Sequence, residues 1–362
     1  MNFQIMPKGA FPGWIDRLAN HYRVVGPRKK HGQYVFDEIQ GAADLSLHYS
    51  TSVLPPKKYL VPQKEVLLNY HLDGSSLEIA TEPEPTVILG LHTCDLHALK
   101  LFDRIFSQGF TDQHYQAHRQ SVTLVSIECL NTCSAHAFCR DLGTASATDG
   151  FDLHMLDLGS SYAFTVGTEK GAGLLKGFHH VFDATEKDLA LINDTLQEKW
   201  INFPYRLDFN IQELPELLQE NFYSTMWDEL GQKCLACGSC TQVCPTCYCF
   251  DVTDEVDLLL AEGQRVRRWD SCQIHEFAMV AGGHNFRERL AARQRHRFMR
   301  KGKYQMDAYG MVGCVGCGRC ARACLAHIAP VDVFNELYAR SQALEEDVVE
   351  DWRMAVEVEV TA

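Results

Sequence analysis

The chain has 362 residues, 46% of them hydrophobic, which predicts two or more domains with apolar cores. A formal net charge of −13 argues against a nucleic-acid partner, and no apolar run is long enough to cross a bilayer. The first residues lack the basic and apolar regions of a secretory signal. We therefore expect a cytoplasmic protein whose 15 cysteines bind metal or do chemistry.

The first 80 residues predict a small α+β module. Residues 11–22 have the periodicity of an amphipathic helix, and residues 34–36 and 45–49 predict strands. The prolines in residues 54–62 exclude a central strand and predict an extended surface segment. An Asp-Gly pair at 73–74 between two short apolar runs predicts a hairpin.

The next segment predicts a parallel strand–helix–strand unit. Residues 86–92 and 122–127 are apolar runs of buried-strand length, and a helical pattern with Asp95 as N-cap lies between them. The carboxyl ends of adjacent parallel strands meet at one edge, where open sheets place ligands. Four thiols follow these two strands: Cys94, Cys129, Cys133 and Cys139. The pattern predicts a metal site, and it leaves open an iron–sulfur cluster, a single zinc ion, or buried thiols without a metal.

Two cysteine runs in the second half have the C-x₂-C-x₂-C-x₃-C spacing of ferredoxins. In such runs three thiolates hold one cluster and the fourth holds the other. The first predicted [4Fe-4S] cluster takes Cys234, Cys237, Cys240 and Cys324. The second takes Cys314, Cys317, Cys320 and Cys244.

The roughly 70 residues between the runs are too many for a compact ferredoxin (314 − 244 = 70). Helical patterns at 274–280 and 286–301 predict that this domain is all-α, with the clusters between helices. We thus expect an α+β domain at 1–210, a helical ferredoxin-like domain at 211–343, and an acidic tail at 344–362. The N-terminal domain holds the parallel strand–helix–strand unit, and helices at 183–200 and 213–230 lead to the boundary.

Two further features of the second half stay open. Three cysteines fit neither run and suit packing or the surroundings of a cluster: Cys247, Cys249 and Cys272. The linker between the runs is strongly basic, which fits a solvated helix face, a dock for an acidic partner, or a means of raising cluster potential.

Other short stretches accompany the two runs in a fixed order. They are Leu54-Pro-Pro-Lys-Lys, His92-Thr-Cys-Asp-Leu-His-Ala-Leu, Glu128-Cys129, Leu142-Gly-Thr, Pro-Thr-Cys247-Tyr-Cys249, Arg-Arg-Trp-Asp-Ser-Cys272 and Ala281-Gly-Gly-His-Asn-Phe-Arg. This order resembles the iron–sulfur β subunit of cytoplasmic [NiFe] sulfhydrogenases and the closely similar iron–sulfur subunit of anaerobic sulfite reductases. Two departures are Cys133 upstream of a lone Cys139, in place of a Cys-x-Cys pair, and Leu325 in place of proline after Cys324.

The resemblance implies a non-catalytic electron-transfer subunit with no flavin or nickel of its own. One partner would be a flavin- and NAD(P)-binding subunit. The other would be a catalytic subunit, most consistently that of a cytoplasmic [NiFe] hydrogenase used by an anaerobe. The equivalent subunit of an anaerobic sulfite reductase is the first alternative. A self-contained iron–sulfur or flavin enzyme and a zinc-stabilised binding module are alternatives of other classes.

Overall fold

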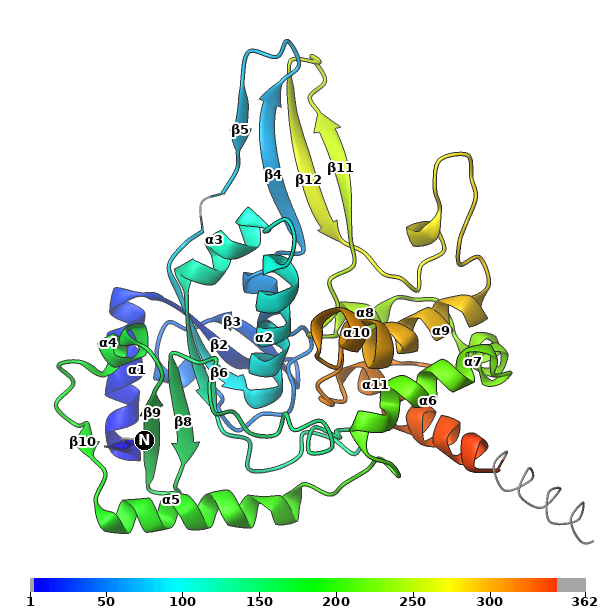
Figure 1. The fold of residues 1–362 in the computed structure, drawn as a ribbon. Coiled ribbons are helices and arrows are strands. Elements are labelled where there is room, and N and C mark those ends of the chain that lie inside the picture. The colour runs from blue at the N-terminus through cyan, green and yellow to red at the C-terminus, as the bar shows by residue number, and fades with distance from the viewer. Residues whose placement is uncertain (1–2, 82, 344–362) are drawn as a thin grey trace, which may run out of the picture.

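The computed structural model describes residues 3–81 and 83–343, and the predicted acidic tail lies outside them. A mixed eight-stranded sheet organises the first half, in the order β10-β1-β9-β8-β7-β6-β2-β3 (Figure 1). Its strands are β1 (Phe3–Pro7), β2 (Arg23–Lys30), β3 (Gln33–Glu38), β6 (Thr86–His92), β7 (Val122–Ile127), β8 (Leu153–Asp157), β9 (Ser161–Val166) and β10 (Phe182–Asp183).

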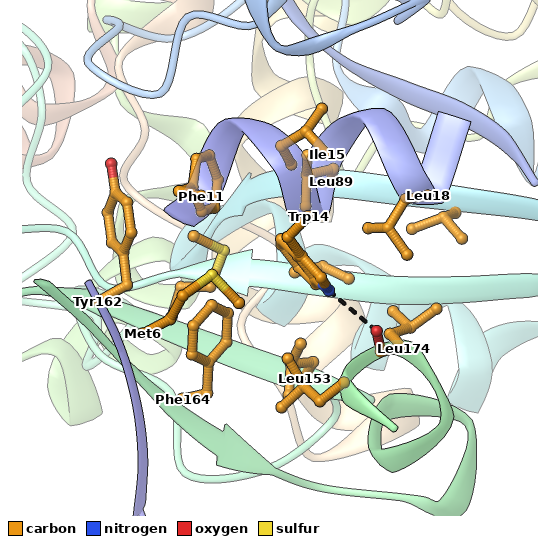
Figure 2. Packing of buried hydrophobic residues seen from close by; sticks show 14 of the residues in the cluster. Met6, Phe11, Trp14, Ile15, Leu18, Leu89, Leu153, Tyr162, Phe164 and Leu174 are labelled. Atoms are coloured by element: carbon orange, nitrogen blue, oxygen red, sulfur yellow. Dashed lines mark hydrogen bonds between the residues drawn. The ribbon is translucent and has the colours of Figure 1, made fainter. Parts of the chain in front are cut away.

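Helices cover both faces of this sheet. On one face α1 (Phe11–His21) and α4 (Glu169–Leu175) enclose an apolar core, in which the Trp14 indole donates to the Leu174 carbonyl at 2.9 Å (Figure 2). On the other face lie α2 (Thr93–Ser107) and α3 (Gln113–Ser121). Burial on both faces explains why β6 is an unbroken apolar run.

The predicted strand–helix–strand unit forms the centre of the sheet. Strands β6 and β7 pair in parallel, with His92 opposite Ile127, and β2 and β8 extend the parallel pairing outward. The register places Cys94 and Cys129 two residues beyond the same sheet edge, as the sequence predicted.

A second, four-stranded antiparallel sheet contradicts the predicted fold class. Its order is β11-β12-β4-β5, and it projects beyond both halves of the protein (Figure 1). Strands β4 (Lys64–His71) and β5 (Leu77–Ile79) are the predicted hairpin, whereas β11 (Phe250–Val256) and β12 (Glu262–Trp269) come from the region predicted to be all-α.

The fold-class prediction was therefore wrong in two respects. The first half contains a large mixed sheet, not only a short parallel unit, and the second half contributes a strand pair. Strand β1 was missed because it pairs with β9, about 160 residues later in the chain. Strands β11 and β12 were missed because charged side chains hide their alternation, and ion pairs such as Arg265–Asp254 (2.9 Å) join them.

Helix α5 (Glu186–Glu198) runs beneath the sheet in Figure 1 and packs on it through Ile192. The second half has an apolar core of its own, which includes Leu218, Trp227, Phe298 and Phe334. Its helices are α6 (Leu214–Glu220), α7 (Met226–Lys233), α8 (Ser239–Gln242), α9 (Leu290–Met299), α10 (Gln305–Tyr309), α11 (Arg319–Ala323) and a helix over residues 330–343. A π-helical turn, Arg300–Tyr304, joins α9 to α10. In the described part of the chain, no helix has the length and apolar character to span a membrane.

Several local predictions also need correction. Residues 45–49 form no strand, and residues 274–280 contain only the short 3₁₀ turn Glu276–Ala278. The predicted surface segment at 54–62 holds the 3₁₀ turn Pro56–Tyr59, in which Lys57 is buried. Asp95 lies within α2, after its N-cap His92, because its carboxylate pairs with a buried arginine.

Candidate metal centres

The first ferredoxin-type site comprises Cys234, Cys237, Cys240 and Cys324. All four line one small pocket, together with Leu325, although Cys324 comes from the other run. The two runs follow similar backbone paths, since Gly238 and Gly318 precede α8 and α11 with φ of 73° and 72°. Similar paths let each run contribute its last cysteine to the other site.

The second ferredoxin-type site comprises Cys314, Cys317, Cys320 and Cys244. Burial raises the pKa of the Cys320 thiol, and the neighbouring thiols raise it further. Cys314 is also close to Cys244 and Cys317. Because metal ligation requires thiolates, a bound cluster would offset the cost that burial imposes on these charges.

Backbone amides and one side chain donate to the sulfurs of these sites. The Ala236 amide lies 3.3 Å from Cys234 Sγ, and the Gly316 amide lies 3.5 Å from Cys314 Sγ at the equivalent place. Gln294 Nε2 donates to Cys234 Sγ at 2.8 Å. Such donors favour the thiolate and tune the potential of a cluster that it holds.

The third thiol site comprises Cys94, Cys129, Cys133 and Cys139, at the carboxyl edge of β6 and β7. Burial raises the pKa of Cys133, and its neighbours Cys129 and Cys139 raise it further. Burial raises the pKa of Cys94, and the nearby Cys129 thiol raises it further. The four thiols therefore lie near one another at this edge of the sheet.

Two contacts bind the third thiol site to the second half. Cys94 packs against Cys317 in one buried cluster. Next to it, Arg319 of α11 makes a bidentate pair with Asp95 at 2.7 Å for both bonds, and each side chain is 1% exposed. The third thiol site and the second ferredoxin-type site are thus neighbours.

Each of the three sites offers four thiols, which is the ligand set of a [4Fe-4S] cluster. Within residues 3–81 and 83–343, no group of three or more Cys, His, Asp or Glu side chains is arranged to hold one metal ion.

Buried cations surround the sites. Arg297 and Lys301 belong to the basic linker, for which raising the cluster potential was one of the open interpretations, whereas Lys57 was not predicted as a functional residue. Burial lowers the pKa of Arg297, but the thiols of Cys240 and Cys320 outweigh this and raise the pKa above its ordinary value. Lys301 donates to Thr246 Oγ1 at 2.7 Å near Cys244. Burial lowers the pKa of Lys57, which lies 4.2 Å from the Trp269 ring, to about 8. Lys57 lies in the Leu54-Pro-Pro-Lys-Lys stretch, one of the motifs that carry the family resemblance, and this stretch was the sequence signal that could have identified it.

The basic linker thus divides into two groups. Arg267, Arg293 and Arg297 are buried, so they are not a solvated face. The exposed Arg265, Arg268 and Arg289 pair with carboxylates of the same chain. Most of these basic side chains are therefore buried or paired with carboxylates of the same chain.

Comparisons with known proteins agree with the two cysteine runs and the wider set of motifs. The 4Fe-4S dicluster domain family matches residues 233–328. Sulfhydrogenase 2 subunit beta of Pyrococcus furiosus is 34% identical over 328 residues, which are 90% of this chain and 96% of that protein. No solved structure matches the chain.

Proposed function

Since the chain belongs to the family of sulfhydrogenase β subunits, we propose that it is an iron–sulfur electron-transfer subunit of a hydrogenase complex. The observation that carries this proposal is the contiguity of its thiol sites. Cys94 packs on Cys317, and Arg297 lies near both Cys240 and Cys320. A bound cluster at each site would accept and donate single electrons.

The residues of the chain itself hold and insulate the centres. Eight thiolates would bind the two [4Fe-4S] clusters that the ferredoxin-type sites predict, with Arg297 and Lys301 offsetting their charge. At the second site Cys244 and Cys317 are buried, and Cys314 and Cys320 are half-buried, which limits the access of water to the sulfurs. In this proposal the chain is a non-catalytic cytoplasmic component that links the catalytic subunit to a flavin- and NAD(P)-binding subunit.

The third thiol site would hold a third [4Fe-4S] cluster. Its support is the proximity of the four thiols to one another and the packing of Cys94 with Cys317. The test is Cys94→Ser, which should lower the iron content by about four atoms per chain. Cys249→Ser, which changes a half-buried thiol outside all three sites, is the control and should keep full iron. Unchanged iron in Cys94→Ser would instead favour the interpretation that these four cysteines are thiols that bind no metal.

The function is tested by a cofactor inventory of the complex, purified without oxygen through a tag on this chain. We expect nickel and flavin on co-purifying chains and iron on this one. Sirohaem without nickel would instead indicate a sulfite reductase. Recovery of the brown chain alone, with bound flavin, would favour a self-contained enzyme.

A further inference from the structure

A pocket of about 330 Å³ lies beside the ferredoxin-type sites and contains the three cysteines of the second half that belong to neither run. It opens between the start of β11, α9 and the π-helical turn. Cys247, Cys249 and Cys272 all line it. This size is sufficient for a small molecule.

Two of these thiols are held together by the base of a hairpin. Cys249 immediately precedes β11, and Cys272 lies three residues after the end of β12. The Asp270 amide donates to the Cys249 carbonyl at 2.9 Å, beside the Phe250–Trp269 strand pair. The Cys249 and Cys272 thiols line the same pocket and lie close enough for each to shift the pKa of the other.

The two thiols have different environments. The neighbouring Cys249 thiol lowers the pKa of Cys272, and Gln273 Nε2 lowers it further by donating to Cys272 Sγ at 3.4 Å. The neighbouring Cys272 thiol, together with burial, raises the pKa of Cys249. Cys272 is therefore the better nucleophile and Cys249 the better resolving thiol.

Cations line the same pocket. Arg297, Arg300 and Lys301 face it, alongside the aromatic Phe250 and Phe277. No Asp or Glu is among its lining residues in the described chain. The wall therefore favours an anionic ligand with an apolar part.

We propose that Cys249 and Cys272 are a redox-active dithiol–disulfide pair, and that the pocket binds a small anionic molecule containing a disulfide bond. The proposal rests on the proposed function, because the electrons come from the neighbouring sites. Cys272 lies near Cys240 of the first site, and Cys247, the third cysteine of the pocket, lies next to Cys244 of the second.

The exchange conserves atoms and electrons. Cys272 Sγ attacks one sulfur of the ligand R–S–S–R, so that the ligand S–S bond breaks and the first RS⁻ leaves. Cys249 Sγ then attacks Cys272 Sγ, which forms the Cys249–Cys272 disulfide and releases the second RS⁻. The two thiol protons pass to the two leaving groups. Two electrons from the relay and two protons from water restore the dithiol, so R–S–S–R becomes two RSH.

The first test maps the disulfide in the cluster-loaded full chain. After equilibration with dithiothreitol redox buffers without oxygen, free thiols are alkylated and peptides are identified by mass spectrometry. We expect a reversible Cys249–Cys272 cross-link at unchanged iron content, and none in Cys249→Ser or Cys272→Ser. Alkylation of both thiols at every buffer ratio, or cross-linking only after iron is lost, would overturn the proposal.

The second test uses two matched probes, the dianionic 2,2′-dithiodiacetate and the dicationic cystamine. The dithionite-reduced chain should cleave the anionic probe about tenfold faster, a preference worth about 1.4 kcal/mol. Arg300→Gln should reduce this preference, whereas Arg289→Gln, outside the pocket, should keep it. Equal rates for both probes, or unchanged cleavage in Cys272→Ser, would contradict the proposed site.

The two proposals fail in different ways. If the clusters take up electrons but no cross-link forms, the dithiol proposal fails and the relay stands. If the cross-link forms but reduced clusters do not open it, the link between the pair and the relay is wrong. If no cluster is present, the proposed function itself fails.

Discussion

At the scale of single residues, buried charge distinguishes the cluster region from the rest of the chain. Arg297 is 5% exposed and lies near cysteines assigned to two different sites. In a low-dielectric interior, such a guanidinium stabilises an electron added to either cluster. Its place on α9 gives it influence over both ferredoxin-type sites.

We therefore expect Arg297→Gln to make these clusters harder to reduce. The potential should fall by about 60 mV, which corresponds to tenfold in a one-electron equilibrium. Redox titration followed by EPR measures the shift. Arg289→Gln is the matched control, because Arg289 is exposed and pairs with Asp228 at 2.9 Å. Equal reduction potentials in the two variants would show that Arg297 contributes to packing but does not influence the potential of the clusters.

At the scale of elements, the loops around the second ferredoxin-type site and the third thiol site interlock. The Phe138 amide donates to the Gly316 carbonyl at 2.8 Å. Gly316 has a φ of 63°, and a Cβ added there would lie 2.6 Å from the backbone nitrogen of Cys139. Only glycine fits this crossing of the two loops.

Gly316→Ala should therefore separate the loops and reduce iron at both sites. Gly143→Ala is the control, since Gly143 has a φ of 65° and nothing lies within 4 Å of an added Cβ. The control should cost only the backbone strain, about 1–2 kcal/mol, and retain iron. Iron per chain and the thermal midpoint are measured for both. Full iron content in Gly316→Ala would mean that the two loops can separate without loss of metal from either site.

The four-stranded sheet is fastened to α3 by a buried carboxylate. Glu65 of β4 accepts from Arg267 of β12 at 2.6 Å and contacts His118 of α3 at 2.9 Å. Burial raises the pKa of Glu65, but the hydrogen bond with His118 and the charge of Arg267 outweigh it and lower the pKa below its ordinary value. A carboxylate with a lowered folded pKa stabilises the fold above its unfolded pKa.

This stabilisation should be lost as the pH falls below about 4.5, through the folded pKa of Glu65. Hydrogen exchange over β4 and β12, followed by mass spectrometry at pH 7 and pH 4, should show acid-dependent opening. Glu65→Gln should open these strands at both pH values and remove most of the pH dependence. Glu78→Gln, exposed in β5, should behave as the unaltered chain does. Protection of β4 that is independent of pH in all three proteins would refute the assignment.

At the scale of the whole molecule, the thiol sites are arranged in series across the two halves. The second ferredoxin-type site is in the middle, because it contacts the third thiol site through Cys317 and shares Arg297 with the first. The first site has an exposed cysteine, Cys237, and so lies nearest the surface. Electrons that cross the chain should pass through the middle site.

Cys320→Ser should remove the middle cluster and about four iron atoms per chain. Electron flow through the assembled complex should then fall at least about tenfold, because the remaining centres are no longer adjacent. Rapid-freeze EPR of the outer centres and turnover of the complex measure the two effects. Normal turnover after loss of the middle iron would contradict the serial arrangement.

Local patterns predicted much of this protein correctly. Cysteine spacing indicated two sets of four thiols, and the structure brings each set together. The apolar runs at β6 and β7 predicted a parallel pair, whose shared edge gathers Cys94 and Cys129. These predictions succeeded because spacing and alternation are local consequences of turn and strand geometry.

Partners distant in sequence escaped prediction. The pairing of β12 with β4 joins residues about 200 apart, and charged strands such as β11 lack an apolar pattern. The burial of Lys57 and Arg297 depends on thiols contributed by other segments.

The sequence by itself thus determined the cysteine runs, the central parallel unit and the family. Only the tertiary structure decided the two sheets, the contact between Cys94 and Cys317, and the meeting of Cys249 with Cys272. The physical reason is that the spacing of the cysteine ligands is a property of one short segment. The burial of a side chain and its contacts depend instead on which distant segments pack together.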